Sequence, residues 1–206
     1  VMKFTADKSQ IVDSLQNAAA VAERRQTIPI LANLRLKAIS GKLEVTATDL
    51  EIQVKTYSDL LSIEEEGETT VSARKMSELC RSLPDAENVE FTLKDGKLTV
   101  SSKNFHGDFA TISADDFPEL EVNEDQDTTE ISSGALKRIL TKTAFSMASQ
   151  DVRYYLNGLL LELSGEELKG VATDGHRLAL SSIEAKGNGL EMRNILPRKA
   201  VLELAK

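Results

Sequence analysis

Hydrophobic and polar residues alternate with a period of two along several stretches of the chain. The clearest are 42–56 ("KLEVTATDLEIQVKT") and 88–102 ("NVEFTLKDGKLTVSS"). This alternation is typical of β-strands that bury one face. The short sequences "SGK", "KDGK" and "TDG" occur next to such stretches or within them, and they predict tight turns.

Other stretches follow the helical period. In 133–150, one stripe is mostly apolar and the opposite face is polar and basic, and we expect Ser132 or Ser133 to be the N-cap. The stripe consists of Leu136, Ile139, Leu140, Thr143 and Met147, and the opposite face of Lys137, Arg138, Thr141 and Lys142. We also expect helices in 8–25, 74–83 and 198–206.

The chain contains a repeat at an offset of 125 residues. The stretch 31–52 matches 156–177, so that Leu31 corresponds to Leu156 and Asp49 to Asp174. A fixed offset over this length indicates duplicated domains. We place the boundary in the acidic stretch 119–130, which gives a first domain at 1–126 and a second at 127–206.

A shorter repeat lies within the first domain. At an offset of 55 residues, "GKLEVTATDLEI" (41–52) resembles "GKLTVSSKNFHG" (96–107). Each half-domain is predicted to have the order β-α-β-β-β. The predicted fold class is α+β, with helices on one face of antiparallel sheets.

Length and composition restrict the class of protein. The 206 residues suffice for one large domain or two modest ones. The single cysteine, Cys80, excludes an intramolecular disulfide and is typical of a reducing cytoplasm, and we expect it to be a small apolar helix residue. The first ten residues lack the apolar core of a signal peptide, and no apolar run reaches transmembrane length. We therefore expect a soluble, cytoplasmic protein.

The net charge of −8 is unevenly distributed. The predicted helical stretches 8–25, 74–83, 133–150 and 198–206 hold twelve Lys and Arg but four Asp and Glu, a net charge of +8. The rest of the chain is correspondingly acidic. Basic helices backed by acidic sheets indicate a surface that contacts a polyanion without reading its sequence, although solvated helix faces often carry Lys and Arg as well.

Seven motifs, spread over essentially the whole sequence, resemble the bacterial sliding clamps, the β subunits of DNA polymerase III. They are "TIPILANL", "TATDLEI", "ARKMSELCRSLP", "ADDFPEL", "FSMASQDVRYYLNG", "ATDGHRLAL" and "LPRKAVLEL". The resemblance implies a DNA clamp fold, in which three such domains form a subunit and two subunits close head to tail into a homodimeric ring around duplex DNA. It implies a non-enzymatic processivity factor without cofactor, metal or membrane association. The implied partners are double-stranded DNA, replicative and translesion DNA polymerases, the clamp loader, and mismatch-repair and ligase-type clamp-binding proteins.

This chain departs from the family in its length. The second copy of the repeat stops inside a helix, so we expect a fragment that lacks roughly 45 residues of the second domain and the whole third domain. We do not expect such a fragment to close a ring.

The resemblance implies that DNA is contacted by residues of three motifs. They are Arg25, Gln150, Tyr154, Tyr155, Arg198 and Lys199. Arg and Lys neutralise phosphates, and Tyr can hydrogen-bond a phosphate or pack against a base. Neighbouring residues on a strand point to opposite faces, so the alternative for these tyrosines is that one is buried in the sheet. We expect Tyr155 to be the more exposed. Arg74 and Lys75 are weaker candidates by internal equivalence to Arg198 and Lys199.

The resemblance also implies one wall of a groove for a short peptide from a polymerase or loader. The wall consists of Leu156, Thr173, Gly175, His176, Arg177 and Leu178. Phe105 and Phe109 are the candidate apolar contacts with a neighbouring subunit, on an edge strand. Two ordinary core aromatics remain an alternative at these positions, and Gly107 stands where the family resemblance leads us to expect a bulkier residue.

Two other functions remain open from the sequence. Asp174 and His176 could serve a hydrolase, but no G-x-S-x-G, H-E-x-x-H or Cys–His arrangement supports this. Asp174 has a counterpart, Asp49, whose surroundings contain no His, so we expect both aspartates to cap turns. The second alternative is a repeat scaffold without a role on DNA.

Overall fold

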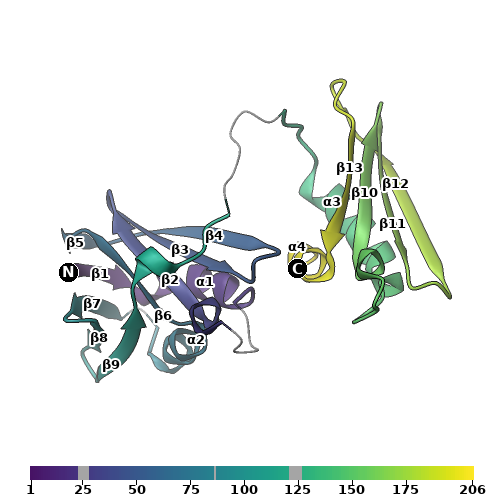
Figure 1. The fold of residues 1–206 in the computed structure, drawn as a ribbon. Helices are drawn as coiled ribbons and strands as arrows, with labels where there is room; N and C mark the ends of the chain where they lie inside the picture. Colours follow the sequence, from purple (N-terminus) through teal and green to yellow (C-terminus); the bar gives the residue numbers. More distant parts are fainter. Residues whose placement is uncertain (23–27, 86, 121–126) are drawn as a thin grey trace. The chain divides into compact units, whose positions relative to one another are not determined.

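The computed structural model describes residues 1–22, 28–85, 87–120 and 127–206, which form two compact units, Val1–Glu121 and Val122–Lys206 (Figure 1). Each unit has its own sheet and its own buried core. Arg25, one of the predicted DNA contacts, lies outside the described residues.

The first unit is built on a nine-stranded sheet with the order β4-β3-β2-β6-β9-β8-β7-β1-β5. Its helices are α1 (Lys8–Ala19) and α2 (Ala73–Ser82). Its strands are β1 (Met2–Asp7), β2 (Asn33–Ile39), β3 (Lys42–Thr48), β4 (Gln53–Asp59), β5 (Ser62–Glu65), β6 (Gly67–Ser72), β7 (Asn88–Lys94), β8 (Lys97–Ser102) and β9 (Phe105–Ile112). Neighbouring strands pair antiparallel.

The second unit is a four-stranded antiparallel sheet with the order β12-β11-β10-β13. Its strands are β10 (Gly158–Ser164), β11 (Glu167–Thr173), β12 (Leu178–Glu184) and β13 (Met192–Pro197). Helix α3 (Ser133–Thr143) packs over β11 and β12, and α4 (Arg198–Leu204) packs against β10 and β13. Ser132 is the N-cap of α3, because its hydroxyl accepts a hydrogen bond from the Ala135 backbone at 3.3 Å. The α+β fold is confirmed.

The bounds of the strands confirm the 125-residue repeat. Strands β10, β11, β12 and β13 begin and end 125 residues after β2, β3, β4 and β6, respectively. The predicted turns are also present. In the hairpin β2–β3, Ser40 and Gly41 have φ of 50° and 79°, and in β7–β8, Asp95 and Gly96 have φ of 52° and 72°. Two consecutive left-handed residues match the twist of antiparallel strands, which is why Gly follows a small polar residue at both turns.

The predicted strand before the second unit's helix is absent from the described residues. At the repeat offset, β1 corresponds to 127–132, which is irregular. In the first unit β1 pairs with β7, a strand that follows α2. The counterpart of α2 is α4, which ends at Leu204 near the last residue of this sequence. A strand needs a partner for its backbone hydrogen bonds, so the β-α-β-β-β prediction is wrong for this part of the second unit.

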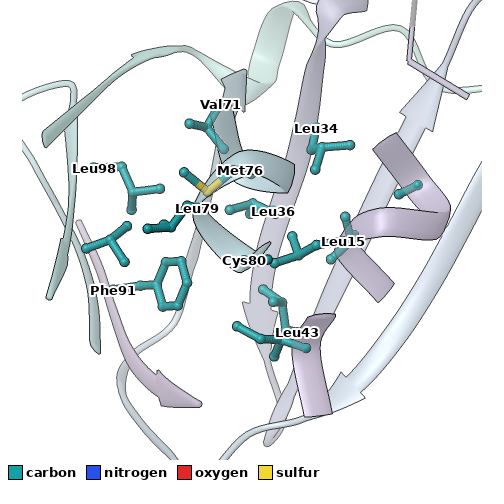
Figure 2. Packing of buried hydrophobic residues seen from close by; sticks show 14 of the residues in the cluster. Leu15, Leu34, Leu36, Leu43, Val71, Met76, Leu79, Cys80, Phe91 and Leu98 are labelled. Atoms are coloured by element: carbon teal, nitrogen blue, oxygen red, sulfur yellow. The ribbon is translucent and has the colours of Figure 1, made fainter. Parts of the chain in front are cut away.

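Alternating strand residues and the inner stripes of both helices form the first core. Leu34 and Leu36 of β2 and Leu43 of β3 lie with Leu15 of α1 and Met76 of α2, all at most 1% exposed (Figure 2). Burying each such side chain contributes roughly 1.5–3 kcal/mol to folding. In α3, most of the predicted stripe is buried, which confirms its amphipathic orientation.

Candidate functional site

Three helices present exposed basic side chains. These are Arg74, Lys75 and Arg81 on α2, Lys137, Arg138 and Lys142 on α3, and the half-exposed Arg198 and Lys199 on α4. In α2 and α4 two of them occupy the first turn, where the helix dipole disfavours positive charge. The helix dipole therefore does not favour their placement, although Arg74 forms an i,i+4 ion pair with Glu78 at 2.9 Å.

Helix α1 departs from the predicted charge pattern. Its one basic residue among those described, Lys8, is 7% exposed and turned inward. The Lys8 ammonium donates to the Leu83 carbonyl at 2.6 Å, just after α2, and to the Asp85 carboxylate at 2.8 Å. The exposed residues of α1 are polar or acidic. The prediction that α1 has a basic outer face is thus wrong for the described residues.

The predicted DNA-contact motif of the second unit forms a closed loop between α3 and β10. Asn157 closes it, because its amide accepts from the Asp151 backbone N–H at 2.9 Å and donates to the Asp151 carbonyl at 2.8 Å. A backbone bond from Ala148 to Leu156 at 2.9 Å holds the two ends together. Gln150 stands at the tip, exposed, with φ of 60°. A non-glycine residue is uncommon in this conformation.

An ion pair within the loop fixes Arg153. Its guanidinium donates to both Asp151 oxygens, at 3.0 and 2.9 Å, and its backbone N–H donates to the same carboxylate at 2.8 Å. These hydrogen bonds lower the pKa of Asp151 to about 2. The loop therefore keeps its charge pattern throughout the neutral range.

The two tyrosines lie on a short 3₁₀ helix, Tyr154–Leu156, and not on a strand. Tyr154 is 82% exposed and Tyr155 51%, with the rings edge to face at 5.8 Å between centroids. The expectation that Tyr155 is the more exposed is wrong, and so is the alternative that one tyrosine is buried. A helical turn does not alternate its side chains between two faces, so both rings are available to a ligand.

The stretch 173–177 is a turn that repeats the one at 48–52. The Asp174 carboxylate accepts from the backbone N–H groups of His176 and Arg177 at 2.9 and 3.0 Å, and these bonds lower its pKa. The Asp49 carboxylate accepts in the same way from the backbone N–H groups of Glu51 and Ile52, at 3.1 and 3.0 Å. Asp174 is therefore a turn-capping residue, as expected, and the geometry gives no support to a hydrolase.

The second turn differs from the first at its positive-φ position. Gly175 has φ of 88°, while the first unit places Leu50 there with φ of 75°. Glycine adopts this conformation without strain, whereas a leucine does not. The Arg153 guanidinium lies directly beside Gly175. If residue 175 had a Cβ, that atom would lie 3.4 Å from a guanidinium nitrogen.

The structure brings most of the predicted peptide wall together. Thr173 and Leu178 are cross-strand partners on β11 and β12, and the turn between them carries Gly175, His176 and Arg177, all exposed. Leu178 is 64% exposed, whereas Leu156 is 8% exposed. Leu156 therefore offers little surface for direct contact in this structure.

Sequence reasoning missed Arg153 and Phe145, two side chains that contact the peptide wall from the segment between α3 and β10. Arg153 lies over Gly175, and Arg177 lies 5.6 Å from the ring centroid of Phe145, a cation–π contact. Phe145 is 59% exposed, unusual for a ring adjoining a helix stripe. Both residues stood within the recognised motifs, but their packing joins segments that are far apart in the sequence.

Phe105 and Phe109 lie on β9 and pack against the first core while staying partly exposed. Leu98 of β8 faces Phe109 across the sheet. The Phe105 ring covers Gly107, where an added Cβ would lie 2.7 Å from it. Among the described residues, β9 pairs with β6 through Thr70 and Val71 alone, so its first six residues have an open edge. This geometry is compatible with a contact between Phe105, Phe109 and a neighbouring subunit, and equally with two ordinary core aromatics.

Within the described ranges, no group of three or more His, Cys, Asp or Glu is arranged to hold a metal ion. No helix in the same ranges is long and apolar enough to cross a membrane. Cys80 is buried, and burial raises the pKa of its thiol to about 11, which makes it unreactive in the folded state.

Solved structures of DNA sliding clamps match this chain closely, so the chain has the DNA clamp fold. The DNA polymerase III subunit beta of Pseudomonas aeruginosa matches with a TM-score of 0.93 and 40% identity, over 99% of this chain and 56% of that one. The beta subunit of Thermotoga maritima matches with a TM-score of 0.90 and 29% identity, over 100% of this chain and 55% of that one.

The sequence comparisons give the family. Residues 2–121 match the DNA polymerase III beta subunit, N-terminal domain, and residues 130–206 match its central domain. The beta sliding clamp of Pseudomonas aeruginosa is 40% identical over 206 residues, and that of Escherichia coli is 41% identical over 204. The chain therefore belongs to the family of DNA polymerase III beta subunits, the beta sliding clamps. It spans 56% of the length of these relatives.

Proposed function

We propose that this chain is part of a DNA replication processivity factor, a non-enzymatic clamp subunit that encircles duplex DNA and tethers DNA polymerases to it. The observation that carries the proposal is membership of the sliding-clamp family across both units of the chain. The exposed basic faces of α2, α3 and α4 support it, because they supply positive charge for phosphates.

The proposed DNA contacts lie on the loop after α3 and the first turn of α4. Gln150, Tyr154 and Tyr155 are exposed on the loop, and Arg198 and Lys199 begin the helix. Arg198 also donates to the Met147 carbonyl at 3.3 Å, which ties the helix to the start of that loop. Arg25 completes the proposed set from the sequence alone. We expect weak, salt-sensitive binding, since the rest of the chain is acidic.

The proposed partner site is the turn after β11. Leu178 offers an apolar contact, Gly175 allows a close backbone approach, and His176 and Arg177 supply polar edges to an extended peptide. We propose that such peptides come from replicative and translesion polymerases, the clamp loader and repair proteins. A head-to-tail homodimer of complete subunits, with Phe105 and Phe109 at the contact, is part of the same proposal.

Fluorescence anisotropy with two duplexes of unrelated sequence, across a range of salt concentrations, tests the DNA proposal. Gln150→Ala combined with Tyr154→Ala should weaken binding equally on both duplexes. Lys199→Ala should lower the slope of log K against log salt concentration by about one unit. Lys169→Ala is the matched control, because Lys169 lies on β11, outside the proposed contacts, and it should bind like the parent chain. Discrimination between the two duplexes would contradict the proposal.

A further inference from the structure

The sequence contains two Asn-Gly dipeptides, Asn157–Gly158 and Asn188–Gly189. An asparagine followed by glycine can react without an enzyme, because the backbone nitrogen of the glycine attacks the side-chain amide carbon of the asparagine. Glycine favours this reaction, since it has no Cβ that would shield its nitrogen. The two dipeptides are identical in sequence, so a difference in their reactivity comes chiefly from the structure around them.

Hydrogen bonds and strand pairing fix Asn157–Gly158. The Asn157 side-chain oxygen accepts from the Asp151 backbone N–H at 2.9 Å, and its Nδ2 donates to the Asp151 carbonyl at 2.8 Å. Gly158 is buried, begins β10 and pairs with Pro197 of β13. The Asn157 amide therefore has to break two hydrogen bonds before it can turn toward the Gly158 nitrogen.

Asn188–Gly189 lies instead in an exposed turn between β12 and β13. The Leu190 backbone N–H donates to the Gly187 carbonyl at 2.7 Å, which closes the turn. Asn188 and Gly189 are its two central residues, both exposed, with φ of 50° and 83°. Two consecutive positive φ values are typical of a type I′ turn, which accepts asparagine and glycine at these positions.

The turn places little restraint on the two reacting groups. In the part of the chain that the structure describes, neither the Asn188 side chain nor the Gly189 N–H forms a hydrogen bond. A Cβ added to Gly189 would meet no atom within 4 Å. The Gly189 nitrogen is thus open to solvent and to the neighbouring amide, and the peptide can rotate once the single hydrogen bond of the turn breaks.

We propose that Asn188 is a site of spontaneous modification, which converts to isoaspartate and aspartate in the folded protein while Asn157 stays intact. The Gly189 nitrogen forms a bond to Cγ of Asn188, and the bond between Cγ and Nδ2 breaks. Nδ2 leaves as ammonia with the proton that the Gly189 nitrogen gives up, and a succinimide ring remains. Water then opens the ring. Attack at Cγ gives aspartate, and attack at the backbone carbonyl carbon gives isoaspartate.

The isoaspartyl product changes the turn in two ways: it adds a methylene to the backbone and a negative charge to the surface. Leu190 packs against the second core, and Gly187 lies so close to Gly165 that an added Cβ would be 2.5 Å from its carbonyl oxygen. We expect the longer backbone to loosen these contacts. The exposed α-carboxylate of the product makes the chain a substrate for a carboxyl methyltransferase that uses S-adenosylmethionine and recognises isoaspartyl residues.

Peptide mapping by mass spectrometry tests the proposal on the folded 206-residue chain. After incubation in neutral buffer, trypsin releases Asn188 in the peptide 187–193 and Asn157 in the peptide 154–169. Conversion of an amide to an acid increases the mass of the peptide. The peptide 187–193 should gain mass, and 154–169 should do so at least about 30-fold more slowly, because two hydrogen bonds hold Asn157. A sample digested without incubation corrects for conversion during digestion.

Two further measurements separate the effect of structure from that of sequence and identify the product. In a chain unfolded by guanidinium chloride, both peptides should gain mass at similar rates. An isoaspartyl methyltransferase supplied with S-adenosylmethionine should label the peptide 187–193 from the incubated folded chain, and should not label it before incubation.

Two variants assign the nucleophile. Gly189→Ala should slow the mass gain of the peptide that contains Asn188, because the added methyl group shields the nitrogen; the open space around Gly189 accommodates it. Gly41→Ala is the matched control. Gly41 also has a positive φ, 79°, and open space around it, but it follows Ser40 and not an asparagine, so the rate at Asn188 should not change.

Four results would overturn the proposal. In the first, both peptides gain mass at equal rates in the folded chain. In the second, 187–193 gains mass in the unfolded chain alone, which would mean that the turn protects Asn188. In the third, Gly189→Ala converts as fast as the parent. In the fourth, the methyltransferase labels nothing in the converted peptide, which would mean that water hydrolyses the amide directly.

Discussion

Replacing Lys8 by Met should lower the free energy of opening of the first unit, because Lys8 links the start of α1 to the end of α2. The Lys8 side chain is 9% exposed, and its ammonium donates to the buried Leu83 carbonyl. Methionine keeps the apolar stem but leaves that carbonyl without its charged donor. Hydrogen bonds to charged groups contribute about 1.5–3 kcal/mol, so we expect a loss of about 2 kcal/mol.

Thiol labelling of Cys80 measures this loss without a separate probe. Cys80 is the one cysteine of the chain, is 3% exposed and lies on α2. Its raised pKa of about 11 keeps the folded thiol protonated, so labelling proceeds through opened molecules. If reclosing is faster than labelling, a loss of 2 kcal/mol raises the labelling rate about 30-fold.

Asp85→Asn is the matched control, because it removes only the ion pair between Lys8 and Asp85 and keeps the bond to the Leu83 carbonyl. The Asp85 side chain is 96% exposed, and ion pairs with such exposure contribute little. We expect its labelling rate to stay within about threefold of the parent. Equal rates for Lys8→Met and Asp85→Asn would refute the reasoning that the buried carbonyl bond is the stabilising part.

Three further predictions follow from the two loops and from the repeated turn. Gly175→Ala should destabilise the second unit by about 1 kcal/mol, and Leu50→Gly should slightly stabilise the first unit. The reason is that both positions have positive φ, which glycine adopts without strain. Thermal unfolding of each variant measures the change in stability. The folded pKa of Asp151, about 2, lies below its ordinary value of 3.8, so its contribution to loop order should be complete above pH 3.8 and be lost as the pH falls through 2; carboxyl ¹³C NMR titration follows it. In a complete subunit, His176→Ala and Leu178→Ala should each weaken binding of clamp-binding peptides, and unchanged titration curves for both would remove the site assignment.

The repeat made much of this fold predictable. Because β2 and β10 keep the same alternation at a fixed offset, the sequence indicates the strands, their turns and the duplication together. The role of Asp174 was predictable for the same reason, since Asp49 occupies the same turn without a histidine nearby. The family resemblance supplied the candidate DNA and peptide residues, which neither composition nor spacing identifies.

Contacts between distant segments were not predictable in the same way. Lys8 has an ordinary place in a helix, and its partner lies 75 residues further along the chain. Arg153 meets Gly175 because two loops converge, and no local pattern encodes that approach. The tyrosines were misjudged because a strand was assumed where Tyr154 begins a 3₁₀ turn.

The central claim is that this chain belongs to a clamp that holds DNA by encircling it. The most direct test loads the chain, completed with the remaining residues of the Pseudomonas aeruginosa relative, onto nicked circular duplex DNA with a clamp loader. The account predicts that the protein stays on the circle through a high-salt wash and leaves when a restriction enzyme linearises the DNA. Retention that is unaffected by linearisation, or an absence of retention on the circle, would contradict it.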